Sequence, residues 1–138
     1  MRHYLRPKKS IESFTTALRD RESDTLLLSI AEQYCKAGQG SIAKQYLNRV
    51  IGMTANDDIA FKSHTLLAQI YMDEEKYDDA EKEFESILEK DENSADAHYG
   101  LGVIYEERGD AVKARALWRQ CLKIDRNYQG AIKKLAEK

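Results

Sequence analysis

The chain has 138 residues, a formal net charge of −2, 42% hydrophobic residues and 33% charged residues. That length suits a single domain, and the near-neutral charge gives no electrostatic case for a nucleic-acid-binding protein. One proline and seven glycines are too few turn formers for an all-β chain, so an all-α fold is expected. No segment approaches the roughly 18 consecutive apolar residues that a membrane-spanning helix requires.

The N-terminal segment is basic, with four Lys or Arg residues and no acidic residue in 1–9. It leads into Ser-Ile-Glu-Ser and not into an apolar run, so it does not have the pattern of a signal peptide. We interpret it as a flexible basic arm. Cys35 and Cys121 show no metal-binding spacing, and unpaired thiols favour a reducing compartment. A cytoplasmic protein is therefore expected, unless the chain is a fragment of a larger one.

Apolar residues at helical spacing predict a series of helices along the rest of the chain. Ser10 is a suitable N-cap for a first helix at 10–23, in which Phe14, Ala17 and Leu18 fall on one stripe. Further helices are expected at about 24–36, 41–53, 58–73, 77–90, 95–108 and 111–124, with a C-terminal capping helix at 129–138. Short segments that contain Gly, Asn or Asp separate them.

Three segments of the chain repeat one pattern of residues. In 95–128 the pattern is Leu101-Gly102-x-x-Tyr105, followed by Ala114 and Trp118. The same positions 34 residues earlier, in 61–94, hold Leu67, Ala68, Tyr71, Ala80 and Phe84. A further 37 residues earlier, in 24–60, they hold Ile30, Ala31, Tyr34, Ala43 and Leu47. Three successive copies with a nearly constant offset indicate a repeat architecture.

These residues resemble the tetratricopeptide repeat (TPR), a unit of about 34 residues in which a helix A, a tight turn and an antiparallel helix B follow one another. The resemblance covers about 24–126 and implies an all-α, right-handed solenoid of three helix pairs. The helix at 10–23 is then similar to a lone helix B, and the chain ends in a capping helix. Two departures from the family are visible. Leu27, His64 and His98 stand where the family has Trp, and the boundary Pro is absent.

The repeated small residues have a steric interpretation. An Ala or Gly after the Leu, as in Ala68 and Gly102, lets helix A lie close to helix B. Large residues such as Phe84 and Trp118 are expected to be core residues and not binding sites. Cys121 is expected to be a core thiol.

The resemblance also implies a binding surface, because the A helices of TPR proteins line a concave groove. In this sequence the groove positions are Leu28, Ser29, Glu32, Cys35, Lys36, Lys62, Thr65, Leu66, Gln69, Met72, Asp73, Tyr99, Gly100, Val103, Glu106 and Glu107, with Lys133 and Lys134 from the capping helix. Several are apolar, which predicts a mixed apolar and polar groove for a peptide or helix, with an acidic rim at Glu106 and Glu107. The alternative is that these residues contact only neighbouring repeats or the flanking helices.

One TPR activity can be tested on the sequence. Family members that clamp the C-terminal carboxylate of chaperones are similar to one another in a set of basic and amide residues on their A helices. Here the corresponding positions hold Leu28, Glu32 and Leu66, and the basic pair of the third repeat is replaced by Asp96 and Gly100. The chaperone-tail carboxylate clamp is therefore expected to be absent.

Charge is unevenly distributed along the chain. Residues 73–92 hold eleven acidic and three basic residues, whereas 113–138 hold eight basic and two acidic ones. One interpretation is solvated helix faces with pairing at i,i+4. The other is an acidic belt that meets a basic partner or the basic end of a neighbour.

No residue pattern indicates catalysis, a cofactor or a metal. Gly38-Gln39-Gly40 follows a helix and lacks the context of a phosphate-binding loop. His64 and His98 occupy the same position in successive repeats and are interpreted as packing residues.

The sequence thus predicts a non-enzymatic scaffold that holds a peptide, helix or protein surface in a concave groove, without nucleic acid, membrane or cofactor. The alternative is a self-assembly module, a homo-oligomer or part of a longer TPR array, that associates through its exposed ends.

Overall fold

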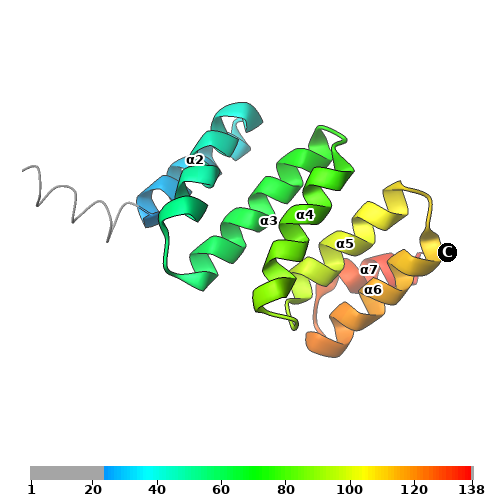
Figure 1. Ribbon diagram of the computed structural model, residues 1–138. Coiled ribbons are helices and arrows are strands. Elements are labelled where there is room, and N and C mark those ends of the chain that lie inside the picture. Colours follow the sequence, from blue (N-terminus) through cyan, green and yellow to red (C-terminus); the bar gives the residue numbers. More distant parts are fainter. Residues whose placement is uncertain (1–23, 138) are drawn as a thin grey trace, which may run out of the picture. The chain divides into compact units, whose positions relative to one another are not determined.

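The computed structural model describes residues 24–137 (Figure 1). The predicted arm at 1–9 and the predicted helix at 10–23 lie outside these residues. The chain divides into two compact units, 1–63 and 64–138, with the boundary inside one helix. Each unit is considered by itself below. The described part of the chain consists of helices and their connecting turns, which confirms the predicted all-α class.

In the first unit, residues 24–36 are helical and α2 spans Gly40–Met53. The rings of Tyr34 and Tyr46 stack with their centroids 5.7 Å apart. The Asp24 carboxylate accepts a hydrogen bond from the neighbouring Thr25 amide at 2.7 Å. It also accepts one from the hydroxyl of the distant Thr54 at 2.8 Å. It thereby ties the start of the first described helix to the segment that follows α2.

The helix α3 spans Asp57–Asp73 and contains the boundary between the two units. The Asn56 side chain accepts a hydrogen bond from the Ile59 amide at 3.2 Å, as an N-cap does. Asp57 and Asp58 lie in the first turn, where carboxylates interact favourably with the helix dipole.

The second unit continues from α3 into α4 (Tyr77–Lys90), α5 (Ala95–Glu107), α6 (Ala111–Ile124) and α7 (Gln129–Ala136). Its predicted boundaries agree with the observed ones to within one residue for α4, α5 and α6. Ser94 caps α5 by accepting from the Ala97 amide, and Asp110 caps α6 by accepting from the Lys113 amide. Helix α5 packs on α4 and α6, and α7 packs on α6.

The core of the second unit follows the repeated pattern. On α4 the buried residues are Ala80, Phe84 and Ile87, and on α6 they are Ala114, Trp118 and Cys121. The spacing of four and then three residues places each set on one face of its helix. Phe84 and Trp118 are each only 2% exposed, which confirms that they are core residues.

The same turn ends the helix A of every repeat. Gly38, Glu75 and Gly109 all have a positive φ, of 76°, 59° and 89°. The residue after each of them donates its amide hydrogen to a carbonyl five residues earlier, from Gln39 to Tyr34, from Lys76 to Tyr71 and from Asp110 to Tyr105. This is the Schellman arrangement, in which a left-handed residue closes the helix. Only the second repeat uses a residue other than glycine for it.

Gly102 has the steric role that the repeat pattern predicts. A Cβ atom at this position would lie 2.3 Å from Nε1 of Trp118, closer than any real side chain permits. The indole N–H of Trp118 donates a hydrogen bond to the carbonyl of Tyr99 at 3.2 Å. The absence of a side chain at Gly102 therefore lets α5 and α6 approach closely enough for this bond.

Candidate partner-binding site

The second half of α3 presents two different faces. Leu67, Ala68 and Ile70 are buried in the core. The predicted groove residues on this helix lie on the other face: Thr65, Leu66, Gln69, Met72 and Asp73. Their spacing of three or four residues places them in one row. Leu66 and Met72 are partly exposed beside the exposed Gln69 and Asp73, so this row is accessible and partly apolar.

The predicted groove residues on α5 lie next to α7. Tyr99 and Val103 are partly buried and pack against a cluster formed by Ala114, Trp118, Cys121 and Ala131. The rings of Tyr99 and Tyr128 lie with their centroids 5.1 Å apart. Tyr99 and Val103 therefore contact the flanking helix α7, as the alternative interpretation of the groove residues predicts.

The polar groove residues on α5 also differ in their surroundings. Glu106 accepts a hydrogen bond from Nζ of Lys134 on α7 at 2.6 Å, and this contact raises the pKa of Lys134. Glu107 is exposed and interacts with Tyr77, whose pKa is raised by partial burial and by the charge of Glu107. Of the predicted acidic rim, one carboxylate is therefore neutralised inside the chain and the other remains at the surface.

Two residues of the predicted groove, Leu28 and Gly100, are buried. Leu28 is only 6% exposed and belongs to the core of the first unit. Gly100 is buried because the ring of Phe84 covers it, and a Cβ atom at Gly100 would lie 2.2 Å from that ring. Neither position is therefore accessible at the surface.

The remaining groove residues of the first unit are accessible to different degrees. Ser29 and Lys36 are exposed, whereas Glu32 and Cys35 are partly exposed. Lys62 lies 3.6 Å from Glu32, and its side chain is 61% exposed. An ion pair this open to water contributes little to stability.

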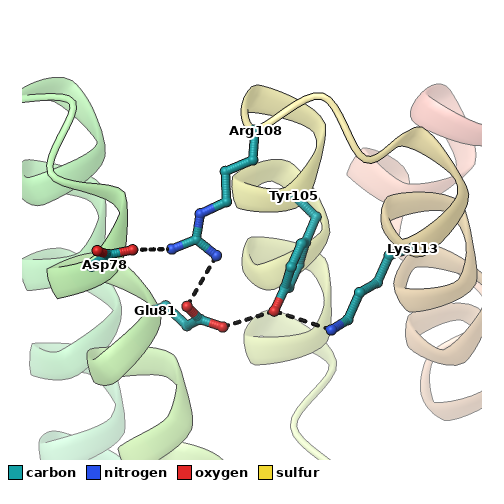
Figure 2. Close-up of polar contacts among 5 residues, drawn as sticks. All are labelled: Asp78, Glu81, Tyr105, Arg108 and Lys113. Carbon is teal, nitrogen blue, oxygen red and sulfur yellow. Dashed lines mark hydrogen bonds and ion pairs between the residues drawn. The ribbon is translucent and has the colours of Figure 1, made fainter.

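Part of the acidic segment is neutralised by the next repeat of the same chain (Figure 2). Arg108 at the end of α5 pairs with Asp78 and with Glu81 of α4, the latter at 3.0 Å. Glu81 also accepts a hydrogen bond from the Tyr105 hydroxyl at 2.9 Å, and that hydroxyl accepts one from Lys113 at 3.1 Å. The cluster joins α4, α5 and the first turn of α6, so these two carboxylates act between repeats.

The two histidines of the described repeats make different contacts. Nδ1 of His64 lies 2.7 Å from a carboxylate oxygen of Glu83, and Nδ1 of His98 lies 2.8 Å from the Ser94 carbonyl. Each is partly buried within its own repeat, consistent with the predicted packing role. Among residues 24–137, no three His, Cys, Asp or Glu side chains gather in a position to hold a metal ion. None of the described helices is long and apolar enough to cross a membrane.

Two weakly acidic groups, the buried Cys121 thiol and the partly buried Tyr128 hydroxyl, lie between α5, α6 and α7. Burial, aided by the charges of Asp125 and Asp96, raises the pKa of the Cys121 thiol to about 11. Burial and a hydrogen bond to the Asp96 carboxylate also raise the pKa of the Tyr128 hydroxyl. Both groups stay protonated at neutral pH, as the predicted core role of Cys121 requires.

Comparison with protein families gives a match over residues 65–132 to the model described as tetratricopeptide repeat. Residues 65–132 therefore belong to the TPR family. The match begins on α3 and extends into α7, so it includes the accessible row on α3 and all the groove residues of α5. A comparison with curated protein sequences found no match.

Solved structures share the TPR fold at low sequence identity. YrrB, described as a TPR protein with an unusual peptide-binding site, has a TM-score of 0.71 and 23% identity over 83% of this chain. The first TPR of Spaghetti (RPAP3), bound to an HSP90 peptide, has a TM-score of 0.70 and 17% identity over 81% of this chain and 86% of its own. A Thermobaculum terrenum O-GlcNAc transferase mutant has a TM-score of 0.71 and 22% identity over 82% of this chain.

The chain spans 57% of the YrrB chain and 21% of the transferase chain. At these identities the likeness is one of fold. The repeats are thus a TPR scaffold, and the properties of the surface depend on this chain's own residues.

Proposed function

We propose that the TPR repeats form a non-enzymatic module that binds a peptide, helix or protein surface through the face of the A helices. We define this A-helix face by its accessible residues on α3 and α5: Thr65, Leu66, Gln69, Met72, Asp73, Tyr99, Val103, Glu106 and Glu107. The observation that carries the proposal is the row on α3. Its partly exposed Leu66 and Met72 lie at the two edges of the row, on either side of the exposed Gln69.

The chemistry of this row suits a protein partner. Leu66 and Met72 supply apolar area, and the unbranched Met side chain adapts to irregular surfaces. Gln69 and Asp73 beside them supply hydrogen-bonding groups that fix the orientation of a bound chain. YrrB is described as having a peptide-binding site, and the RPAP3 repeat is described as bound to a peptide. Both descriptions support peptide binding as the function of this fold here.

The carboxylate clamp is not the expected mode of binding. The positions that carry the clamp's basic and amide groups hold Leu28, Glu32, Leu66, Asp96 and Gly100 here. Two of these, Leu28 and Gly100, are buried. We therefore propose a mode that relies on apolar contact along α3, with a protein in the cytoplasm as the partner and with no nucleic acid, membrane or cofactor involved.

The test compares two double variants in affinity capture from source-cell lysate. Gln69→Arg with Asp73→Arg adds three positive charges to the exposed edge of the row on α3. Glu85→Arg with Gln120→Arg adds the same charge at exposed positions of α4 and α6. We expect the first variant to lose the partner and the second to keep it, because only the first places charge beside Leu66 and Met72.

Circular dichroism of both variants controls for folding. Tyr99→Glu is a poor test because Tyr99 packs on Tyr128 and α7, so it would disturb the fold as well as the face. Equal capture by both double variants would contradict the proposal. If the captured partner is a nucleic acid and moderate salt releases it, the result would instead indicate nucleic-acid binding.

A second candidate function is self-assembly. Leu26 in the first described helix is 60% exposed and Ile132 on α7 is 38% exposed, so each bears a large apolar side chain at the surface. Light scattering on the purified chain over a range of concentrations tests it. A mass that rises with concentration, and that Ile132→Lys returns to the monomer value, would support assembly; a constant monomer mass would exclude it.

A further inference from the structure

A hollow of about 200 Å³ lies between α5, α6 and α7. Its walls are formed by Glu106, Ala111, Ala114, Arg115, Trp118, Lys134 and Glu137. Ala114 and Trp118 are buried and form its inner, apolar part. Ala111 and Glu137 are exposed, so the hollow opens to solvent.

The repeat pattern explains why this space is empty. Ala111 is the first residue of α6, and the equivalent first residue of α4, 34 positions earlier, is Tyr77. Ala80 and Phe84 likewise correspond to Ala114 and Trp118. In the second repeat the Tyr77 side chain is partly buried, and this burial and the charge of Glu107 of the next helix A raise the pKa of its hydroxyl. In the third repeat a methyl group stands in place of that phenol, and the corresponding space is left unfilled.

The walls of the hollow carry two cations whose positions are held by other contacts. Lys134 pairs with Glu106 at 2.6 Å, and its Nζ lies 5.5 Å from the centroid of the Trp118 ring. Arg115 donates hydrogen bonds to the carbonyls of Leu135 at 3.1 Å and Glu137 at 3.4 Å, at the end of α7. Because both side chains are already ordered, a ligand would lose little free energy in fixing them.

These features favour an aromatic ring over an aliphatic side chain of similar size. Cations near a ring face are attracted to it, by about 0.5–1 kcal/mol at exposed sites. A ring can also contact the Trp118 indole in an offset or edge-to-face arrangement. An aliphatic side chain would gain only from burial of its apolar area.

We propose that this hollow, which we name the Ala111 pocket, accepts one aromatic side chain, of Phe or Tyr, from the protein that binds the A-helix face. The inference rests on the proposed function for the source of the aromatic residue. The pocket itself is a property of α5, α6 and α7, and it adds an anchor point beyond the row on α3. A partner residue would thus occupy in the third repeat the space that Tyr77 takes in the second.

The pocket can be tested on the purified chain without knowing the partner. Trp118 is the only Trp of the sequence, so its indole N–H gives a single side-chain signal in a proton–nitrogen NMR spectrum. The probes are N-acetyl-L-phenylalaninamide, N-acetyl-L-tyrosinamide and N-acetyl-L-leucinamide. We expect a saturable shift of the indole signal at millimolar concentrations of the aromatic probes, with roughly two- to five-fold weaker binding of the leucine probe.

Two neighbouring substitutions give a matched pair of variants. Ala111→Tyr places in the pocket the side chain that the second repeat has at this position, and it should abolish the shift. Val112→Tyr adds the same side chain one residue later, where the native residue is 81% exposed, and it should leave the shift unchanged. Equal responses from these two variants, or equal binding of the leucine and aromatic probes, would overturn the proposal.

Lys134→Met provides a further variant if Ala111→Tyr does not fold. It removes one of the two cations and keeps a side chain of similar length, so it should weaken the preference for the aromatic probes. An unchanged preference would contradict the cation–ring argument.

The partner capture described above separates the two proposals. If Gln69→Arg with Asp73→Arg loses the partner while Ala111→Tyr keeps it, the proposed function stands and the pocket is not used. If the aromatic probes shift the Trp118 signal and no partner depends on the row on α3, the pocket binds aromatic groups and the proposed function fails.

Discussion

Single residues set the distance between helices in the third repeat. Gly102 lets α5 lie against Trp118, and Gly100 receives the ring of Phe84 in the same way. Trp118 in turn donates to the Tyr99 carbonyl at 3.2 Å, so its ring is held by both a contact and a hydrogen bond. The small residue of the pattern is therefore as necessary to the packing as the large one.

Gly102→Ala should destabilise the chain. The new methyl group would lie 2.3 Å from the indole nitrogen, so either the ring or the helix must move. Overpacking of this kind lowers the free energy of unfolding by roughly 1–3 kcal/mol. Urea denaturation followed by circular dichroism measures the change. Gly52→Ala on α2 is the control, because nothing lies within 4 Å of the added methyl group and helix propensity favours Ala by up to about 1 kcal/mol. If the Gly102→Ala protein is as stable as the wild type, α5 and α6 can move apart without lowering the free energy of unfolding.

At the scale of an element, each helix A ends in the same left-handed turn. Gly38 and Gly109 adopt a positive φ without steric conflict, but Glu75 has a Cβ atom and a φ of 59°. For a residue with a Cβ atom this conformation costs roughly 1–2 kcal/mol. The turn persists because the Schellman hydrogen bond from Lys76 to Tyr71, at 2.8 Å, and the flanking helices hold it.

Glu75→Gly should therefore stabilise the second repeat. Relief of the strained φ outweighs the greater freedom of glycine in the unfolded chain, and we expect a net gain of about 0.5–1 kcal/mol in the free energy of unfolding. Thermal and urea denaturation measure it. Glu85→Gly makes the same substitution at an exposed position inside α4 and should lower stability by about 1 kcal/mol. A change of the same sign in both variants would contradict the explanation.

At the scale of the whole molecule, the polar side chains connect successive repeats. Arg108 links α5 to α4 through Glu81, Lys134 links α7 to α5 through Glu106, and Arg115 satisfies carbonyl groups at the end of α7. Asp78 and Glu81 of the acidic segment and Lys134 of the basic segment are thereby each paired with a charged residue at the C-terminal end of α5. The charge that remains at the surface is smaller than the sequence suggests.

The buried Cys121 thiol should make the stability of the fold depend on alkaline pH. Its pKa is raised from 9.0 to about 11, so the folded chain keeps this proton at pH values where the unfolded chain releases it. The contribution of this thiol to stability is therefore constant below about pH 9 and falls as the pH rises toward 11. Tyr128, whose pKa is also raised, changes stability in the same direction.

The measurement is the urea midpoint as a function of pH for the wild type, Cys121→Ala and Tyr128→Phe. Each variant has its own stability at neutral pH, but its decline in the alkaline range should be shallower than that of the wild type. If the Cys121→Ala curve runs parallel to the wild-type curve, the thiol is not the titrating group.

The sequence by itself determined the helices, the repeat and the core. Helix periodicity and the 34-residue offset are local and regular, so they predicted α4, α5 and α6 to within one residue and identified Phe84, Trp118 and Cys121 as buried. The turn residues were also visible, because Gly38 and Gly109 mark them. The same 34-residue offset aligns Ala111 with Tyr77, and this replacement of a large residue by a small one is the sequence signal that marks the Ala111 pocket.

Only the tertiary structure decided which predicted groove residues are accessible. Leu28 and Gly100 occupy positions on the expected face, yet both are buried, Gly100 beneath the ring of Phe84. Tyr99 is partly covered by Tyr128, and Glu106 is paired with Lys134. These contacts join residues 16 to 29 positions apart, and they depend on how side chains of neighbouring helices fill the space between them. A repeat pattern specifies which way a residue faces along its own helix, whereas exposure depends on what packs against that face.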